Sequence, residues 1–221
     1  AYIFGWWYAS KRLIELSRRE DVEGGLSSYK KSITLSAIFI VFFGYTSSMM
    51  AWDWIMSIDT HWFSTLFGWF VFSSMGVTGF TAIALFSIYL KRKGYLQHVN
   101  ENHIHDLGKY LWGHTIFWAY IGICQYLLIW YAHIPEETYF YNNRLFTDEM
   151  GFNAWSWVSL GLLVLRFFIP FFALLKRENK RNIKFLSVIA WIVILGQIVD
   201  MYWVAYPSLA KWTHWRYIRT N

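Results

Sequence analysis

Two charged residues within otherwise apolar segments, Arg166 and Asp200, are the strongest chemical signal in this sequence. At 1.5 Å per helical residue, Arg166 would lie about 18 Å from the start of its segment, and Asp200 about 10 Å from the end of the next. An unpaired charge this deep in a membrane costs about 2.5–3.5 kcal/mol even on a lenient scale. We therefore expect Asp200 to face other helices, beside Gln197 and within reach of Arg166. Such a pair could belong to a proton or ion route, or it could be a purely structural ion pair.

A second group of polar residues recurs with helical spacing. His114, Trp118, Ile121 and Gln125 are separated by steps that place them on one face of a helix, with Tyr110 one turn before them. Lipid would not tolerate this face, so it should look inward. It could line a proton path or a pocket for a quinone headgroup, and ordinary hydrogen bonding between helices explains it equally well.

Acidic residues also gather at two predicted connections. Segment 52–62 places Asp53, Asp59 and His61 among Trp and Met side chains, and Glu136 and Glu137 belong to segment 132–153. The first segment could be a proton exit or a docking edge, or Asp59 could simply cap the helix that follows. We expect both segments to contact extramembrane partners.

Residues for metal, haem or hydrolytic chemistry are sparse. Of seven His residues only His114 is well inside an apolar segment, and there is one Cys, so bis-histidine haem and cysteine-ligated metals are not expected in this chain. His98, His103 and His105 lie near Glu101 and Asp106 and could hold a metal, although a solvated loop explains them more simply. No phosphate-binding glycine loop or Ser/His/Asp set is present, so no catalytic, cofactor-binding or metal site is predicted.

The composition indicates the elements that must position these residues. Hydrophobic residues make up 56% of the 221-residue chain, aromatic residues 22% and charged residues 15%, whereas soluble domains carry about 25% charge. Segments of about 20 apolar residues can cross the membrane as helices. The sequence therefore predicts an all-α, polytopic transmembrane bundle with five complete spans: Ile33–Trp52, Phe63–Leu90, Leu107–Tyr131, Ala154–Leu175 and Phe185–Tyr206.

The first residues are expected to be the end of a sixth span, which continues as a helix through 11–23 and ends at Gly24 and Gly25. The whole of 1–221 is then one integral membrane domain, interpreted as a fragment whose earlier helices are missing. In the span Phe63–Leu90, Ser74, Thr78 and Ala82 form a stripe of small residues that we expect to serve close helix packing.

Basic residues alternate between the two sides of the predicted bundle. Loops 11–31, 91–109 and 176–184 carry six, four and five Lys or Arg, whereas loops 53–62 and 132–153 and the tail 208–221 carry none, one and three. The first set defines a basic end, predicted to be cytoplasmic, and the second an outer end that includes the C-terminus. The net charge of +6 is assigned to contact with anionic lipid, and no nucleic-acid partner is expected.

Several longer motifs resemble the ActF family of membrane subunits of bacterial alternative complex III, which belongs with the NrfD/PsrC-like proteins. The resemblance covers about residues 52–207. The motifs are Met56–Gly68, Phe117–Ile121, Gln125-Tyr126, Leu128–Ala132, Pro135–Thr138, Pro170-Phe171, and Asp200–Trp203 followed by Pro207. His133 and Arg166 depart from the family pattern, which more often has Asn at the first position and a His beside the second.

This resemblance implies a subunit of a quinol:cytochrome c oxidoreductase in a bacterial inner membrane. The chain would be the C-terminal half of a larger NrfD-like subunit, would hold no cofactor, and would contribute scaffold and a proton half-channel. Its partners would be the sister subunit ActC, pentahaem and monohaem cytochromes with haem c, a subunit with iron–sulfur clusters, and in some complexes a terminal oxidase. Quinol oxidation would be assigned mainly to the sister subunit, with quinone binding in this chain as the less favoured alternative.

Two alternatives remain open from the residues themselves. A proton-coupled secondary transporter would use the same buried charges, but transporters favour broken helices at the midplane, and Pro170 is the only proline well inside a span. A purely structural membrane anchor would need the charges only for packing. Purification with c-type haem would separate a respiratory subunit from a transporter.

Overall fold

The computed structural model describes residues 2–145 and 154–219, with side chains up to Leu209. This part of the chain consists of helices joined by short connections and contains no strand, which confirms the predicted all-α class. The elements are α1 (Tyr2–Glu23), α2 (Leu26–Met50), η1 (Ala51–Ile55), η2 (Met56–Ile58), α3 (Leu66–Arg92), α4 (Glu101–Ala132), α5 (Pro135–Leu145), α6 (Ala154–Leu163), η3 (Val164–Phe168), α7 (Ile169–Ala173), α8 (Arg177–Arg181) and α9 (Ile183–Arg219).

Five helical stretches among the described residues are long and apolar enough to cross a membrane: Leu26–Ile58, Leu66–Arg92, Glu101–Ala132, Ala154–Ala173 and Ile183–Leu209. They coincide with the five predicted spans, so the chain is a multi-pass helical membrane protein. Ahead of them, α1 runs without interruption from Tyr2 and ends at Gly24 and Gly25, whose φ angles of +59° and +111° favour glycine.

Several helices are longer than the apolar pattern predicts. Asn100 caps α4 by accepting hydrogen bonds from the N–H groups of Asn102 and His103, while His103 Nδ1 accepts from the Asn100 N–H. This capping box starts α4 six residues before the predicted span. At the other extreme, α9 continues through Pro207 to Arg219, beyond the predicted end at Tyr206.

Helices α5 and α8 were not predicted, and α5 is the longer of the two. Within segment 132–153 the chain forms α5, with Pro135 as its first residue, Glu136 and Glu137 in its first turn, and Arg144 in its last. Each of these residue types suits its place in a helix. The first residue of a helix needs no N–H donor, so proline is tolerated there, and acidic residues at the start and basic residues at the end interact favourably with the helix dipole. Residues 146–153, which complete the predicted segment, lie outside the described part of the chain.

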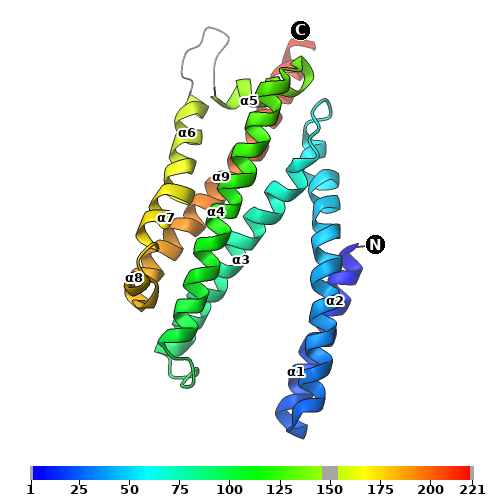
Figure 1. Cartoon of the computed structure of the whole chain (residues 1–221). Coiled ribbons are helices and arrows are strands. Elements are labelled where there is room, and N and C mark those ends of the chain that lie inside the picture. The colour runs from blue at the N-terminus through cyan, green and yellow to red at the C-terminus, as the bar shows by residue number, and fades with distance from the viewer. Residues whose placement is uncertain (1, 146–153, 220–221) are drawn as a thin grey trace.

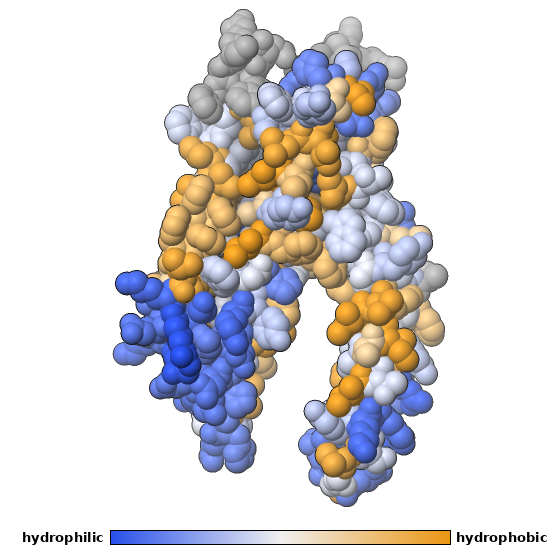
Figure 2. Space-filling view, viewed as in Figure 1, coloured by the Kyte–Doolittle hydropathy of each residue, from blue (hydrophilic) through white to orange (hydrophobic). Residues whose placement is uncertain are grey.

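The helices form two groups (Figure 1). Helix α3 packs against α4 and α9, and the α6–η3–α7 helix and α8 complete this main group. Helices α1 and α2 form an antiparallel hairpin that meets α3 near η1 and diverges from it toward the basic end. On the face drawn in Figure 2, apolar residues gather over the middle of the molecule, the basic tip of the main group is strongly hydrophilic, and the tip of the α1–α2 hairpin is mixed.

The fourth span contains a local helical irregularity around Arg166. Residues 164–168 form the π-helical segment η3, and Pro170 follows it in α7. A proline inside a helix cannot donate a backbone hydrogen bond and clashes with the carbonyl four residues earlier, which here belongs to Arg166. The π segment widens the helix where this conflict occurs, so the span stays continuous and Arg166 lies on an irregular turn.

Candidate functional site

Arg166 and Asp200 form an ion pair in the interior of the main group. Arg166 Nη1 donates to Asp200 Oδ2, and the two residues are 1% and 2% exposed. The Arg166 stem crosses α9 at Gly196, where an added Cβ would lie 2.7 Å from Arg166 Cγ. Glycine is therefore the residue that lets the guanidinium reach Asp200, and the predicted proximity of the two charges is confirmed as a direct contact.

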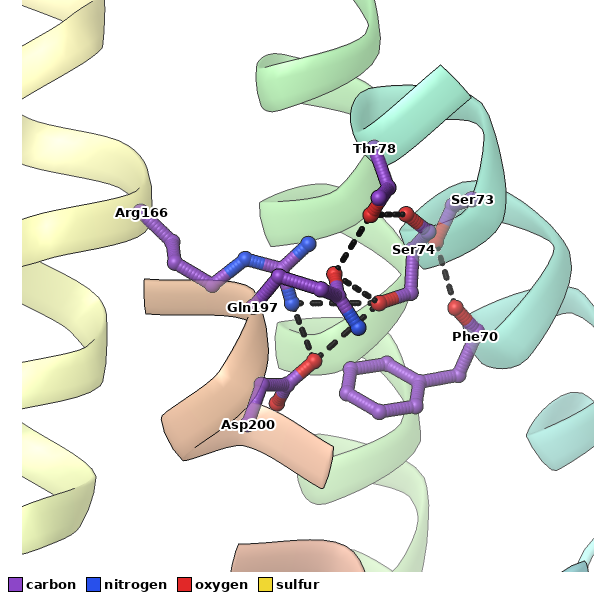
Figure 3. A network of polar contacts seen from close by, with 7 residues as sticks. All are labelled: Phe70, Ser73, Ser74, Thr78, Arg166, Gln197 and Asp200. Atoms are coloured by element: carbon purple, nitrogen blue, oxygen red, sulfur yellow. Dashed lines mark hydrogen bonds and ion pairs between the residues drawn. The ribbon is translucent and has the colours of Figure 1, made fainter. Parts of the chain in front are cut away.

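Helix α3 adds two hydroxyl groups to the pair, and α9 adds an amide (Figure 3). Ser74 Oγ lies 3.1 Å from both Asp200 Oδ2 and Arg166 Nη1, and 3.0 Å from Gln197 Oε1. Thr78 Oγ1 lies 2.8 Å from the same Gln197 oxygen. Since Ser74 carries one hydroxyl hydrogen, it can donate to Asp200 or to Gln197 but not to both at once.

Several polar atoms around the pair have no hydrogen-bond partner among the described residues. They are Asp200 Oδ1, Arg166 Nε and Nη2, Trp118 Nε1 and Gln125 Oε1. The Arg166 guanidinium also lies over the Trp118 ring, 4.4 Å from its centroid. A buried polar atom without a hydrogen-bond partner is energetically costly. Several such atoms in one place therefore indicate a site that binds water or a ligand.

A cavity of about 390 Å³ adjoins the pair and is lined by Asp200, Gln125 and Trp118. Its other walls are almost entirely aromatic and aliphatic, and they come from α3, α4, α5, α6 and α9. Ile123 and Leu160 line it as well and are about half exposed, so the cavity reaches the lateral surface between α4 and α6.

The cavity lies on the outer side of the ion pair. Its lining residues come from the start of α3, the length of α6, the second half of α4 and the outer part of α9, together with α5. Toward the basic end, the side-chain contacts of the pair continue through Gln197 and Thr78, and buried apolar residues such as Val193 and Leu186 follow. The cavity therefore adjoins Asp200 on its outer side, whereas buried apolar residues lie on the opposite side.

The residues predicted on one face of α4 separate into two groups. Trp118, Ile121 and Gln125 are buried, and Gln125 lines the cavity as an inward-facing residue should. His114 is half-buried against the Phe80 ring, and its Nδ1 lies 2.9 Å from the Tyr110 carbonyl oxygen. Tyr110 is 55% exposed and stacks on Phe80, so the expectation that it faces inward is wrong.

The two predicted outer segments contact each other. Trp62 stacks on Phe140 with ring centroids 3.8 Å apart, and its indole N–H donates to the Glu137 carbonyl oxygen. The Tyr139 hydroxyl donates to Asp59, and its burial together with that carboxylate raises the pKa of Tyr139. Asp59 does not cap the next helix, because α3 begins at Leu66 with Thr65 as its N-cap.

The remaining outer candidates lie on the surface. Asp53 accepts a hydrogen bond from the Tyr2 hydroxyl, which joins the outer ends of α1 and η1. His61 and Glu136 are exposed, while Glu137 is half-buried. The structure thus gives Asp53 and Asp59 packing contacts within the chain and leaves His61 and Glu136 facing outward.

Arg144 is a buried charged residue beside the cavity that the sequence pattern did not indicate. It is fully buried, and it donates to the carbonyl oxygens of Phe140, Trp203 and Val204 and to Ser208 Oγ. Burial lowers the pKa of Arg144 to about 10, which still leaves it charged at neutral pH. Its contacts fasten α5 to α9 beside the cavity.

Two further residues were predicted for a different purpose. Ser74 and Thr78 were expected only to let helices approach, yet they hydrogen-bond to the α9 residues of the network. Their four-residue spacing opposite the equally polar Asp200 and Gln197 is the signal that could have indicated this. The cluster around His103 offers no metal site, since no group of three metal-ligating side chains occurs among the described residues and His103 serves the capping box.

Comparison with known proteins adds no family assignment. No family model matches the sequence, and no curated protein matches it.

Proposed function

We propose that this chain is a membrane subunit of a quinol-oxidising respiratory complex of the alternative complex III type, where it contributes scaffold and a proton half-channel. The observation that carries the proposal is the buried carboxylate of Asp200, which is tied to Arg166 and Ser74 on one side and borders a cavity on its outer side. Ionisable groups inside the membrane commonly belong to ion or substrate pathways, and proton relays are one such use. Localisation in a bacterial inner membrane, with the basic end in the cytoplasm, belongs to the same proposal.

In this proposal Asp200 takes up or releases a proton at the inner end of the cavity. The Ser74 hydroxyl can turn between Asp200 and Gln197, so it can pass a hydrogen bond along the network without moving the backbone. Haem c and iron–sulfur clusters would reside in partner subunits, and quinol would be oxidised mainly in the sister subunit. The long motifs within residues 52–207 support this assignment over a secondary transporter, and the fourth span remains one helical stretch despite its π-helical segment.

The decisive experiment replaces Asp200 by Asn in the assembled complex, reconstituted in vesicles. Turnover and proton release are measured per c-type haem, so that a change in the amount of assembled complex does not enter. An amide cannot carry the proton, so a proton relay through Asp200 predicts that turnover and proton release per complex fall about 100-fold. Asp200→Glu should recover part of this loss, and Asp21→Asn on exposed α1 is the matched control. Normal proton release per complex in Asp200→Asn would leave only a structural ion pair.

A second candidate function has its own observation. The cavity combines aromatic walls with unpaired Gln125 Oε1 and Trp118 Nε1, which could hold the ring of a quinol in this chain itself. Gln125→Leu would then raise the KM for quinol while leaving the stability of the complex unchanged. An unchanged KM would assign quinol binding to the sister subunit alone.

A further inference from the structure

The basic end of the main group gathers several cations from two elements that are distant in sequence. Lys109 and His105 lie near the start of α4, while Lys180, Arg181 and Arg177 belong to α8. All four Lys and Arg residues act electrostatically on His105, and Arg181 donates to Asn102 across the two helices at 2.8 Å. Figure 2 shows this tip of the molecule as strongly hydrophilic.

The two helices also carry Glu101, Glu178 and Asp106, but of these only Asp106 forms an ion pair among the described residues. Asp106 is occupied by Lys109, with Nζ and Oδ1 2.7 Å apart. Lys180, Arg181 and Arg177 form no ion pair within the described part of the chain. Arg181 Nε is buried without a hydrogen-bond partner there. The cluster therefore has unused donors as well as surplus charge.

Lys180 is the unusual member of the cluster because it is only 8% exposed. Its stem packs on α4 at Gly108, where an added Cβ would lie 3.0 Å from Lys180 Cβ. Its ammonium lies 5.0 Å from the Trp112 ring centroid and has no hydrogen-bond acceptor among the described residues. Burial and the charge of Lys109 lower the pKa of Lys180, which agrees with an ammonium that the protein itself does not compensate.

We propose that Lys180, Arg181, Lys109 and Arg177 form a binding site for a phosphate group at the membrane surface, as in the headgroup of an anionic phospholipid. Lys180 would hold the phosphate beside Trp112, a residue type that favours the depth of lipid headgroups. Arginine and lysine pockets between membrane helices at this surface suit anionic lipids. This site is independent of the proposed proton route, which lies nearer the outer end.

The test measures lipid binding to the purified full chain in detergent by native mass spectrometry, with phosphatidylglycerol and phosphatidylcholine as probes. We expect a preference for phosphatidylglycerol that Lys180→Gln weakens about 5-fold and Lys180→Arg largely retains. The matched control, Lys30→Gln, removes one exposed charge from α2 at the same end and should change binding less than 2-fold. Thermal unfolding of each variant establishes that the fold is intact.

A separate arm distinguishes the source of the phosphate. Inorganic phosphate is added to the chain with bound phosphatidylglycerol, and a lipid site predicts that the lipid stays bound. Full displacement by inorganic phosphate, still dependent on Lys180, would support the anion site with free phosphate as its ligand. Equal binding of both lipids, or equal effects of Lys180→Gln and Lys30→Gln, would overturn the proposal.

Discussion

At the scale of single residues, the site contains a direct ion pair whose remaining polar atoms are not all hydrogen-bonded. Arg166 and Asp200 satisfy each other through one nitrogen and one oxygen, while Asp200 Oδ1 and two Arg166 nitrogens lack partners among the described residues. Removing one member of a buried pair strands the other charge, whereas removing both leaves only apolar packing. Each member of the pair is therefore needed mainly because the other is a buried charge, while the intact pair adds little stability compared with apolar packing.

This argument predicts the stability of variants of the pair. Arg166→Met should lower the free energy of unfolding in detergent by about 3–5 kcal/mol, because Asp200 remains buried without its partner. The double variant Arg166→Met/Asp200→Leu should recover most of this loss. Tryptophan fluorescence during chemical unfolding provides the measurement, and Glu15→Gln in an exposed pair should have little effect. Additive losses in the double variant would contradict the argument.

At the scale of elements, α5 and α9 depend on each other through Arg144. Pro207 has no N–H, so the Trp203 carbonyl oxygen four residues earlier loses its helical partner. Arg144 Nε donates to that oxygen at 3.2 Å, and Arg144 Nη2 donates to the Val204 oxygen at 2.9 Å. Helix α9 can therefore continue through the proline, and α5 is held in place where Phe140 and Tyr141 line the cavity.

A double-variant cycle tests this dependence. Arg144→Leu leaves buried carbonyl groups unsatisfied and should destabilise the chain by about 1–3 kcal/mol. In a Pro207→Ala background the loss should be smaller, because residue 207 regains the N–H that pairs with Trp203. Thermal unfolding followed by circular dichroism measures both, with Arg18→Leu on exposed α1 as the control. Equal losses in the two backgrounds would show that the proline is not the reason for the contact.

The helices, and part of the site, could be predicted from the sequence. The lengths of the apolar segments predict the spans, and the energetic cost of an unpaired buried charge predicts that Asp200 pairs with Arg166. The contacts of Ser74 and Thr78 could not be predicted, since a small polar residue suits close packing as well as hydrogen bonding. Helix α5 and the position of Arg144 depend on tertiary contacts with α9, and segment 132–153 shows no apolar periodicity strong enough to indicate them.

At the scale of the whole molecule, the main group and the α1–α2 hairpin differ in how much they bury. The most apolar window of Leu26–Ile58 is 11% buried, compared with 39% for Ile183–Leu209. Helix α2 contacts α1 along its length and α3 near the outer end, and its remaining apolar surface faces away from this chain (Figures 1 and 2). Lipid or another protein must cover that surface in the membrane.

The orientation of the molecule gives the last prediction. Fifteen of the 20 Lys and Arg residues lie in segments 11–31, 91–109 and 176–184, and the positive-inside rule predicts that these segments stay in the cytoplasm. After Cys124→Ala removes the only cysteine, new cysteines are placed at the exposed positions His98 in loop 91–109 and Asn143 on α5. A membrane-impermeant maleimide should label Asn143→Cys in spheroplasts and His98→Cys only after permeabilisation. Reversed labelling would place Asp200 nearer the cytoplasm and turn the proposed half-channel around, and labelling of both from one side would contradict the arrangement of spans itself.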